Sequence, residues 1–405
     1  MATNGHHASR YAHIVGWGMA VPERVLTNFD LEAIVETSDA WIRERTGIHE
    51  RRIAGENESA ASLGFAAARR ALVVANILPT AIDLIIVATS TPEHIVPSTA
   101  SLIQDWLGAS NAGAFDLSAA CTGFIYALDM AAQAILSGSI NIALVIGTET
   151  ISRLVDWEDR NTCILFGDGA GAVVVRASNL PGGILSTVLR SDGSGFDLLG
   201  VPTVGSLDAH VPDAGLPRDG SRPTMHKLYM NGREVFRFAT RVIKDSVLEA
   251  VQKAGLTLAD IDWIVPHQAN QRIIDRAAKN LEIPLERFIC NLDRYGNTSA
   301  ASIPLALCEA IADGRIQPDQ TLVLVGFGGG LTWGAMVLRW GVTPPPEPPM
   351  LSRLRRETGY FFARTRSRLS RTWRRLEVLL RAPLRALFRR LSHISWPDEH
   401  AGPPQ

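Results

Sequence analysis

The sequence predicts an α/β protein built from two similar halves, and three observations support this. Short apolar runs, typical of strands buried on both faces, alternate with amphipathic helical stretches. One segment pattern occurs twice, 179 residues apart. Finally, 46% of the 405 residues are hydrophobic, which is enough for a large core and excludes a wholly disordered chain.

The expected strands are short, rich in β-branched residues and bounded by polar residues or glycine: 84–88, 114–117, 143–146, 172–175 and 321–325. Helical periodicity predicts helices over 62–77, 123–136 and 242–254. We interpret Gly167–Gly171 as a tight turn that enters the strand 172–175. The segment from about Gly200 to Met225, rich in proline, glycine and aspartate, is expected to run over the surface.

The repeated pattern begins where a helix ends, a turn follows and an Ile-Asp pair opens an apolar strand. The aspartates of the two pairs are Asp83 and Asp262. Later strands, beginning at Ala143 and Leu322, repeat at the same interval. We interpret this as two related α/β units, and chance similarity between two generic α/β segments is the alternative.

The net charge of −1 hides two parts of opposite charge. Residues 343–405 contain thirteen arginines and five acidic residues, a net charge of +8, which leaves −9 on residues 1–342. Five prolines between Val342 and Met350 predict an extended linker. We therefore expect four parts: halves 1–180 and 181–342, a linker 343–350 and an Arg-rich tail 351–405.

Several classes of protein are disfavoured by the sequence of the body. It has no apolar run near the roughly 18 residues that span a bilayer, and the polar start of the chain does not resemble a secretion signal. The four cysteines lack C-x-x-C and zinc-ligand spacings, so neither a disulfide framework nor a metal site is expected. The acidic body indicates no nucleic-acid binding.

Cys121 is the candidate nucleophile. It follows the expected strand 114–117 and precedes the expected helix 123–136. A thiol at a helix N-terminus lies near free N–H groups and the positive end of the helix dipole, so we expect a lowered thiol pKa. Taken alone, Cys121 is better interpreted as a buried structural cysteine at a helix start than as a catalytic residue.

His267 and Asn297 complete a set of polar residues at three expected strand exits. His267 follows an apolar run, and Asn297 precedes a helix that begins with small residues. Alone, they would be a core or surface histidine and a helix N-cap. With Cys121 they form a nucleophile and two oxyanion-stabilising donors. The glycine-rich segment 326–334 lacks the full G-x-G-x-x-G pattern and the Walker lysine, which excludes a nucleotide loop.

These segments resemble those of β-ketoacyl-[acyl-carrier-protein] synthase III, the initiating condensing enzyme of bacterial fatty acid synthesis. Residues 37–48, 166–171 and 231–236 also match, and the resemblance runs from about Tyr11 to Trp340 with the motifs in family order. It implies a thiolase fold, with two pseudo-symmetric α/β halves packed as a layered αβαβα body. It also implies a homodimer. Separately, four thiols in a chain without a secretion signal indicate a cytosolic protein.

By this resemblance, the reaction is a decarboxylative Claisen condensation of an acyl-CoA primer with malonyl-acyl carrier protein. Cys121 would carry the acyl group, and His267 and Asn297 would stabilise the enolate. The backbone N–H groups of Cys121 and Gly329 would hold the acyl oxygen, and Phe327 would lie beside the leaving carboxylate. The CoA thioester and the carrier-protein phosphopantetheine are substrates, and no cofactor or metal is implied.

The resemblance also supplies two binding surfaces, although each of these residues alone could be an ordinary surface side chain. Val96 stands where some relatives have a bulky aromatic residue that shapes the acyl pocket, which leaves the primer length open. The residues that match the CoA-binding set are Thr37, Trp41, Arg45 and Arg160. Those that match the carrier-protein docking set are Arg237, Gln268, Arg272 and Lys279.

The tail lies outside the resemblance. Its apolar residues follow helical spacing on either side of Pro383, which predicts two basic amphipathic helices. Our hypothesis is peripheral contact with an anionic membrane through residues 351–396. Contact with the acidic body, recruitment of acidic carrier protein and disorder are alternatives. The apolar stripes are Leu369, Trp373, Leu376 and Leu380, then Leu384, Leu387, Phe388 and Leu391.

Two other functions remain open at this stage. A related thiolase-superfamily enzyme of a polyketide, signal-molecule or olefin pathway would keep the fold and the three residues but use another acceptor. A non-catalytic scaffold could use the tail to hold carrier proteins at a membrane, but it would not need Cys121, His267 and Asn297 together.

Overall fold

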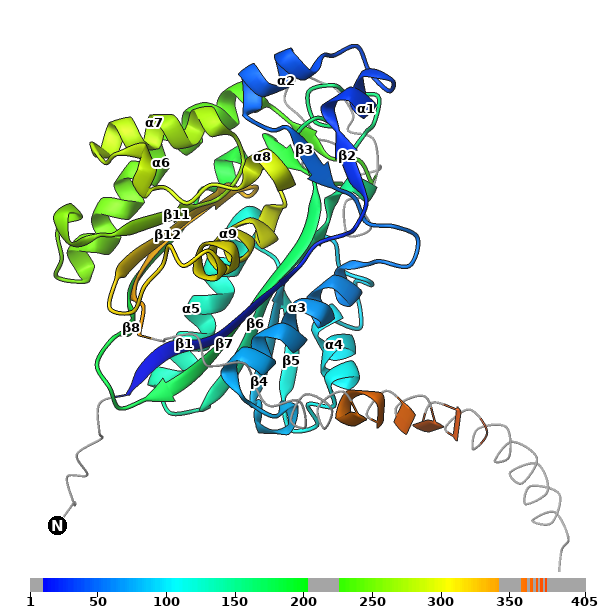
Figure 1. Ribbon diagram of the computed structural model, residues 1–405, viewed down its shortest axis with the longest axis vertical. Helices are drawn as coiled ribbons and strands as arrows, with labels where there is room; N and C mark the ends of the chain where they lie inside the picture. The colour runs from blue at the N-terminus through cyan, green and yellow to red at the C-terminus, as the bar shows by residue number, and fades with distance from the viewer. Residues whose placement is uncertain are drawn as a thin grey trace, which may run out of the picture.

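The computed structural model describes residues 10–202 and 226–341, together with tail residues 358–362, 365–366, 369–370, 372–373 and 376. Two β-sheets and the helices on and between them make up the body (Figure 1). The predicted α/β class is confirmed. The expected linker 343–350, most of the expected surface segment and the second apolar stripe of the tail lie outside the described residues.

Five strands form the first sheet. β4 runs parallel to both β6 and β5, whereas β7 runs antiparallel to both β1 and β6. The expected strands 84–88, 114–117 and 143–146 all lie in this sheet. In spatial order the strands are β1 (Tyr11–Ala20), β7 (Asp168–Ser178), β6 (Ile142–Thr150), β4 (Leu84–Ala88) and β5 (Gly113–Leu117).

Four strands form the second sheet, and the expected strand 321–325 is the first part of its β12. β11 is parallel to β12, and the other neighbours are antiparallel. The strand order is β11 (Trp263–Pro266), β12 (Thr321–Gly328), β13 (Thr332–Arg339) and β8 (Gly183–Ser191). Two small ribbons pair β2 (Val25–Thr27) with β3 (Glu50–Arg52), and β9 (Leu199–Gly200) with β10 (Tyr229–Met230).

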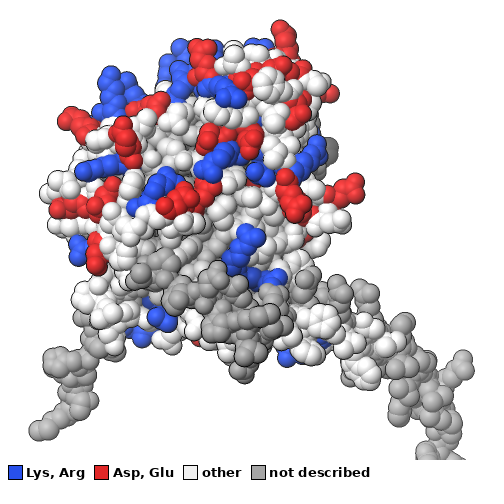
Figure 2. Space-filling view, in the orientation of Figure 1, with Lys and Arg blue, Asp and Glu red and all other residues white. Residues whose placement is uncertain are grey.

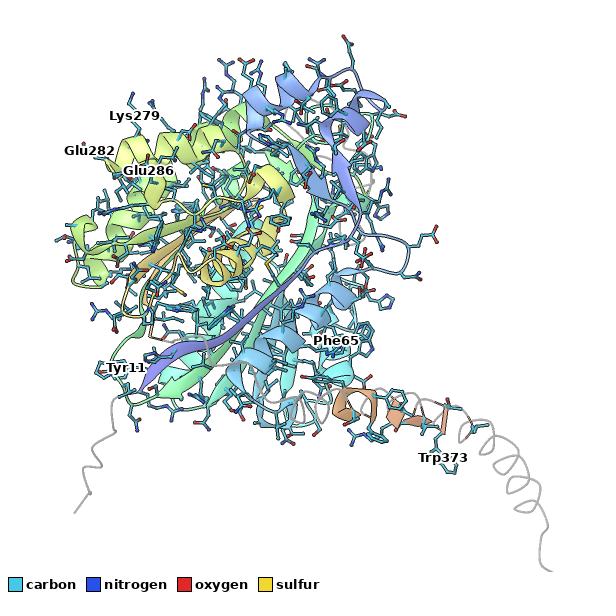
Figure 3. The ribbon with its side chains drawn as sticks, in the orientation of Figure 1. Tyr11, Phe65, Lys279, Glu282, Glu286 and Trp373 are labelled. Atoms are coloured by element: carbon cyan, nitrogen blue, oxygen red, sulfur yellow. The ribbon has the colours of Figure 1, made fainter. Side chains whose placement is uncertain are left out.

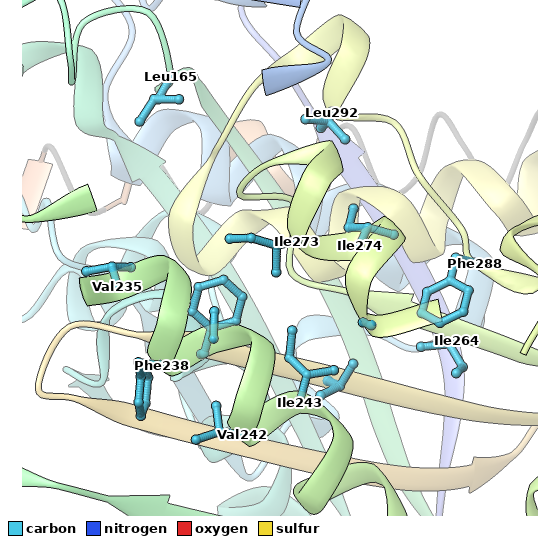
Figure 4. Close-up of a cluster of buried hydrophobic side chains, with 14 of the residues drawn as sticks. Leu165, Val235, Phe238, Val242, Ile243, Ile264, Ile273, Ile274, Phe288 and Leu292 are labelled. Atoms are coloured by element: carbon cyan, nitrogen blue, oxygen red, sulfur yellow. The ribbon is translucent and has the colours of Figure 1, made fainter. Parts of the chain in front are cut away.

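The helices form three layers, so that the body is stacked as αβαβα (Figure 1). Apolar side chains of the outer helical layer on the second sheet pack over that sheet (Figure 4). The outer layer on the first sheet is α3 (Ala60–Ala75) with α4 (Thr99–Leu107), and the middle layer between the sheets is α5 (Gly123–Leu136) with α9 (Ser302–Ala312). The outer layer on the second sheet is α6 (Gly232–Lys253) with α7 (Gln271–Leu281) beside it. Shorter helices are α1 (Asn28–Glu32), α2 (Asp39–Thr46) and α8 (Leu292–Tyr295).

The repeat found in the sequence is present in three dimensions. β4 pairs with β6 in the first sheet as β11 pairs with β12 in the second, parallel in both cases. The two repeated aspartates make the same contact. The Asp83 carboxylate accepts a hydrogen bond from Ile142 N at 3.0 Å, and the Asp262 carboxylate accepts one from Thr321 N at 2.8 Å. Each aspartate therefore connects the start of one strand to its parallel neighbour, as expected of two related α/β units.

Two expected boundaries differ from the structure. Helix α6 begins at Gly232, well before residue 242, because the Asn231 side chain accepts a hydrogen bond from Glu234 N and caps the helix there. The segment Gly167–Gly171 is mostly strand, because β7 begins at Asp168. A Cβ on Gly171 would lie 2.6 Å from the Pro304 Cβ of α9, so this glycine allows close helix–sheet packing and does not form a turn.

The described tail residues between Thr358 and Leu376 are helical, in agreement with the predicted helical tail. Tyr360 is 4% exposed, and its ring packs against Phe65 and the Arg69 guanidinium of α3, at centroid distances of 6.3 Å and 4.7 Å. Farther along, Leu369 and Trp373 are exposed, and Trp373 lies well away from the body (Figure 3). Tyr360 therefore attaches the tail to the body, while the described part of the first apolar stripe faces outward.

No helix in the described ranges has both the length and the apolar character needed to cross a membrane.

Candidate active site

Cys121 lies at the junction between β5 and α5. Ala120 has a left-handed backbone with φ of 47°, and a short 3-10 turn over Ala120–Thr122 leads into α5. The cysteine is 7% exposed. Strand β12 passes so close that a Cβ on Gly328 would lie 2.7 Å from Cys121 N, a distance that real Cβ atoms do not tolerate. Cys121 is therefore held between a helix start and a strand that must carry glycine at position 328.

His267 follows β11, as predicted. Its backbone N–H donates to the carbonyl of Val325 on β12 at 2.8 Å. Its imidazole ring packs edge-on against the Phe327 ring, with centroids 5.2 Å apart. The residue is 2% exposed, and its buried Nδ1 has no hydrogen-bond partner among the described residues. A ligand bound in the cleft can therefore contact this imidazole only through its Nε2 atom.

Asn297 does not follow a strand, so that part of the prediction is wrong. It follows α8 and forms an isolated parallel bridge with Phe166, and its N–H donates to the carbonyl of Leu165 at 2.8 Å. The side-chain Oδ1 accepts a hydrogen bond from Ser299 N at 2.9 Å. Because Oδ1 is engaged in this turn, the side-chain NH₂ is the end that remains for a ligand.

A single cleft brings the three side chains together. Cys121, His267 and Asn297 line a cavity of about 2120 Å³, together with Phe327 and Gly329. The cavity contains elements of both halves, since Cys121 comes from the first half of the chain and the other four residues come from the second. Residues far apart in sequence thus form one continuous wall around the thiol.

Val96 is not part of that wall. It is 81% exposed and lies outside the residues that line the cavity.

Burial determines the charge of the Cys121 thiol and of the His267 imidazole. It raises the pKa of Cys121 to about 12 and lowers the pKa of His267 to about 3. The expectation of a lowered thiol pKa at the helix start is therefore wrong, because the loss of hydration outweighs the helix dipole. At neutral pH the cleft holds a neutral thiol and a neutral imidazole, and a neutral imidazole can still donate a hydrogen bond.

Two polar residues near this part of the cleft were missed in the sequence. Ser299 lines the cleft together with Cys121, and the backbone N–H of the next residue, Ala300, donates to the Glu149 carboxylate at 3.5 Å. Glu149 of β6 is fully buried and also accepts hydrogen bonds from Ser90 N at 3.0 Å and from the Thr91 hydroxyl at 2.7 Å. Burial raises the pKa of Glu149 to about 7. One acid within the apolar run 142–150 was the available signal for Glu149, whereas Ser299 is one small residue among several.

Three of the four residues expected to bind CoA gather in the cleft. The guanidinium groups of Arg160 and Arg45 lie over the Trp41 ring, at 5.1 Å and 5.6 Å from its centroid, and all three residues line the cavity. Thr37 lies outside the lining, and its buried hydroxyl has no partner among the described residues. A flat indole flanked by two planar cations is suited to stacking with a planar heteroaromatic ring.

The residues expected to dock the carrier protein do not form one patch. Arg237 and Arg272 are exposed and line the cleft, where Arg237 also pairs with Glu234 at 2.8 Å. Lys279 lies outside the cleft lining, in the last turn of α7 and close to Glu282 (Figure 3). On the face shown in Figure 2, basic and acidic side chains are interspersed. The basic groups at the cleft are therefore local features of a surface of mixed charge.

Gln268 is not a surface residue, so its predicted docking role is wrong. It is 1% exposed, and its side-chain NH₂ donates to the carbonyls of Pro266 at 2.7 Å and Ile289 at 3.1 Å. Its side-chain oxygen accepts from Asn291 N at 3.0 Å. These bonds tie the end of β11 to the segment before α8, and they position the neighbouring His267.

Within the described ranges, no group of three or more His, Cys, Asp or Glu side chains is placed to hold a metal ion. All four cysteines are free thiols.

Comparison with known proteins gives consistent matches over the body. The family described as 3-oxoacyl-[acyl-carrier-protein] synthase III matches residues 115–193, and its C-terminal counterpart matches residues 251–340. The chain is 53% identical over 328 residues to beta-ketoacyl-[acyl-carrier-protein] synthase III of Symbiobacterium thermophilum, which covers 81% of this chain and 98% of that relative.

Two solved structures are also similar. The 3-oxoacyl-[acyl-carrier-protein] synthase III of Aquifex aeolicus VF5 matches with a TM-score of 0.74 and 48% identity, over 81% of this chain and 99% of that one. The corresponding synthase of Thermus thermophilus matches with a TM-score of 0.76 and 47% identity, over 82% of this chain and 100% of that one. The two family-model matches end at residue 340, before the tail begins.

Proposed function

The chain belongs to the β-ketoacyl-[acyl-carrier-protein] synthase III family of thiolase-fold condensing enzymes, and from that premise we propose how its cleft carries out the reaction. An acyl group from acyl-CoA is joined to the two-carbon unit of malonyl-acyl carrier protein, CO₂ is lost, and the β-ketoacyl-carrier protein that initiates fatty acid synthesis is formed. The observation that carries the proposal is the convergence of Cys121, His267 and Asn297 on one cavity.

In the first half-reaction, the Cys121 sulfur attacks the thioester carbonyl of acyl-CoA and CoA leaves. This covalent step divides one difficult transfer into two easier ones. We propose that the backbone N–H groups of Cys121 and Gly329 stabilise the oxyanion. Gly329 supports this role by its position, since a Cβ on it would lie 3.7 Å from the Cβ of Ala120, next to the nucleophile.

In the second half-reaction, malonyl-carrier protein loses CO₂ and leaves an enolate. His267, through Nε2–H, and Asn297, through its side-chain NH₂, donate hydrogen bonds to the enolate oxygen. The low pKa of His267, about 3, supports a neutral donor, and the Asn297 side chain is oriented by its bond to Ser299 N. Loss of one such donor typically costs roughly 3–4 kcal/mol of transition-state stabilisation. Phe327, which packs on His267, supplies an apolar surface beside the departing carboxylate.

We propose that the adenine of CoA stacks in the group formed by Trp41, Arg45 and Arg160, with Thr37 behind it. The acidic carrier protein would meet Arg237 and Arg272 at the cleft mouth, and Lys279 more weakly because it lies farther out. No bound cofactor is needed, since the CoA thioester and the phosphopantetheine arm are both substrates.

A homodimer is supported by the edge of the first sheet. β5 is the edge strand there, and Phe115 on it is 38% exposed. An exposed edge with an apolar side chain is suited to pairing with a second copy. We propose that two copies join along β5, which lies directly before the nucleophile.

We further propose a cytoplasmic location with peripheral contact of the tail to anionic membrane. The exposed Leu369, Trp373 and Leu376 and the net charge of +8 on residues 343–405 support this. Co-sedimentation of the full chain with anionic vesicles tests it. Binding that is lost in a chain ending at residue 341 supports the contact, and absence of binding at physiological salt refutes it.

Intact mass spectrometry after incubation with acyl-CoAs of different length tests the main proposal. The expected result is one acyl adduct per chain that is absent in Cys121→Ala, and the most reactive acyl chain identifies the primer. Extension by malonyl-carrier protein but not by malonyl-CoA then supports fatty acid synthesis over a related pathway with another acceptor. Absence of an adduct with every donor would instead favour a non-catalytic scaffold.

A further inference from the structure

The turn after α8 holds Asn297 against the segment 164–167. The Asn297 backbone N–H donates to the carbonyl of Leu165 at 2.8 Å, and the Asn297 carbonyl accepts a hydrogen bond from Gly167 N at 3.0 Å. These two bonds flank Phe166, which forms the isolated parallel bridge with Asn297. Leu165 and Phe166 also line the cleft. The position of this segment therefore determines where the Asn297 side chain lies relative to a bound substrate.

Arg51 is a buried arginine that reaches the same segment. It lies on β3 and is 0% exposed, which is rare for a charged side chain. Its Nη2 donates to the carbonyl of Ile164 at 2.7 Å. Its Nη1 donates to the Asn28 side-chain oxygen at 2.9 Å and to the carbonyl of Leu26 at 3.2 Å. Among the described residues, every hydrogen-bond partner of this guanidinium is thus a neutral oxygen. Because burial of a charge is unfavourable, an arginine in this place indicates that its geometry is needed.

Two glycines bring the backbone of Arg51 close to both the segment and the turn. A Cβ on Gly167 would lie 3.0 Å from the Arg51 Cβ. A Cβ on Gly296, which has φ of 62°, would lie 3.4 Å from the Arg51 Cβ and 2.7 Å from the carbonyl oxygen of Leu165. Strand β3, the cleft-lining segment and the turn before Asn297 are therefore packed directly against one another, and Arg51 contacts all of them.

We propose that Arg51 is a positioning residue for Asn297 in the loss of CO₂. A planar guanidinium presents its N–H donors in fixed directions, here one toward the carbonyl of Ile164 and the others toward the segment 26–28. It therefore fixes the distance between these two parts of the chain. Asn297, which is bonded to the first of them, is held where its side-chain NH₂ meets the enolate oxygen. The inference rests on the proposed function in one respect, the role of Asn297 as an enolate donor.

Arg51→Lys keeps the charge and removes the geometry. A lysine ammonium is a compact group, so it bonds to the carbonyl of Ile164 or to the segment 26–28 but does not connect them. Arg51→Met removes the buried charge as well and is made in parallel, in case a half-bonded ammonium prevents folding. The matched control is Arg52→Lys, because the Arg52 side chain is partly exposed and donates elsewhere, to the carbonyl of Glu23 at 3.4 Å.

Three quantities are measured on the full-length chain. They are the rate of CO₂ release from malonyl-carrier protein, the rate of Cys121 acylation at saturating acyl-CoA, followed by intact mass, and the melting temperature. Saturation is needed because the Asn28 side chain also donates to Asp39 at the start of α2, the helix that carries Trp41. Weaker binding of acyl-CoA is thereby separated from the acylation step.

Arg51→Lys is expected to lower CO₂ release by roughly 10- to 100-fold, because a displacement of about 1 Å at a reacting group can cost roughly 100-fold in rate. Acylation should stay within a few-fold of wild type, and Arg51→Met should show the same difference between the two steps. When either substitution is added to Asn297→Ala, CO₂ release should fall no further, because the side chain that Arg51 positions is already absent. Arg52→Lys should match the wild type in all three measurements.

Unchanged CO₂ release in folded Arg51→Lys and Arg51→Met would overturn the inference. Equal losses of CO₂ release and acylation would also overturn it, as would a full further loss in the Asn297→Ala background, since both indicate a general structural role. If Asn297→Ala itself releases CO₂ at the wild-type rate, the proposed role of Asn297 is refuted. The ¹⁵N signal of Asn297 in asparagine-labelled protein then decides the positioning: a signal that Arg51→Lys displaces supports it, and an unmoved signal overturns it.

Discussion

Replacing Gly328 with alanine tests how tightly the nucleophile is held. The new Cβ would lie 2.7 Å from Cys121 N and 3.0 Å from the Cys121 Cβ. Both neighbours are rigid: one is backbone at a helix start, and the other is the first atom of the reactive side chain. Ordinary contact begins at 3.4 Å, so β12 and the β5–α5 junction must separate by about 0.7 Å.

The size of the effect follows from that displacement. A misplacement of about 1 Å at a reacting atom can cost roughly 100-fold in rate, so we expect acylation of Cys121 to fall by about 10- to 100-fold. Overpacking of a tight interior typically costs about 1–3 kcal/mol, which lowers the melting temperature by several degrees. CO₂ release from malonyl-carrier protein should change less, because the atoms nearest to the new Cβ belong to Cys121 and Ala120 and not to His267 or Asn297.

The assay is the time course of Cys121 acylation by acyl-CoA, with CO₂ release and the melting temperature measured on the same samples. Gly193→Ala is the matched control, because no atom lies within 4 Å of a Cβ at that position. It should acylate and melt like the wild type. Wild-type acylation by Gly328→Ala would show that the strand and the nucleophile separate freely, and the reasoning from close packing would be refuted.

Three further predictions concern other residues of the site. Asn297→Ala should lower CO₂ release by roughly 100- to 1000-fold with little change in acylation, and equal losses in both would argue against its role as an enolate donor. Trp41→Ala should raise the KM for acyl-CoA by about 10-fold or more and leave the KM for malonyl-carrier protein unchanged; an unchanged KM for acyl-CoA contradicts adenine stacking there. The pKa of Glu149 is raised from 4.5 to about 7. Between these pH values the folded state therefore keeps a proton on Glu149 that the unfolded state has lost. Burial of the Glu149 carboxyl becomes more destabilising as pH rises through this window. Thermal melts should therefore show Glu149→Gln gaining stability relative to wild type from pH 4.5 to 7, by up to about 1.4 kcal/mol per pH unit, and a constant difference would contradict a raised pKa.

Local sequence patterns were sufficient for most of the architecture. The alternating apolar runs identified β4, β6 and β12, and the recurring Ile-Asp pairs identified the two related halves. In both halves the aspartate side chain makes a bond to the start of a neighbouring strand, which explains why the same pair occurs twice. The boundaries of helices and strands were harder to predict where tertiary contacts decide them. Gly171 is an example, because its role is to let Pro304 approach the strand.

The candidate site could be predicted from the sequence only in part. Cys121 and His267 each follow an expected strand in the sequence, so their place at the ends of strands could be inferred. Asn297 was identified with the family resemblance, but its setting was not: it follows a helix and pairs with Phe166. Gln268 looks like a surface amide beside His267, yet three hydrogen bonds hold it inside. Nothing local distinguishes an inward from an outward glutamine at the end of a strand.

The sequence by itself determined the α/β class, the repeat, the choice of Cys121 as candidate nucleophile and the separation of an acidic body from a basic tail. Each of these depends on periodicity, composition or residue order, which are local properties of the chain. Only the tertiary structure decided the burial that keeps Cys121 and His267 neutral, and the placement of Ser299 in the same cleft as Cys121. The physical reason is that hydration loss and hydrogen-bonding distance depend on which distant segments meet. Cys121 and Ser299 share one wall because the two halves of the fold close around a single cleft.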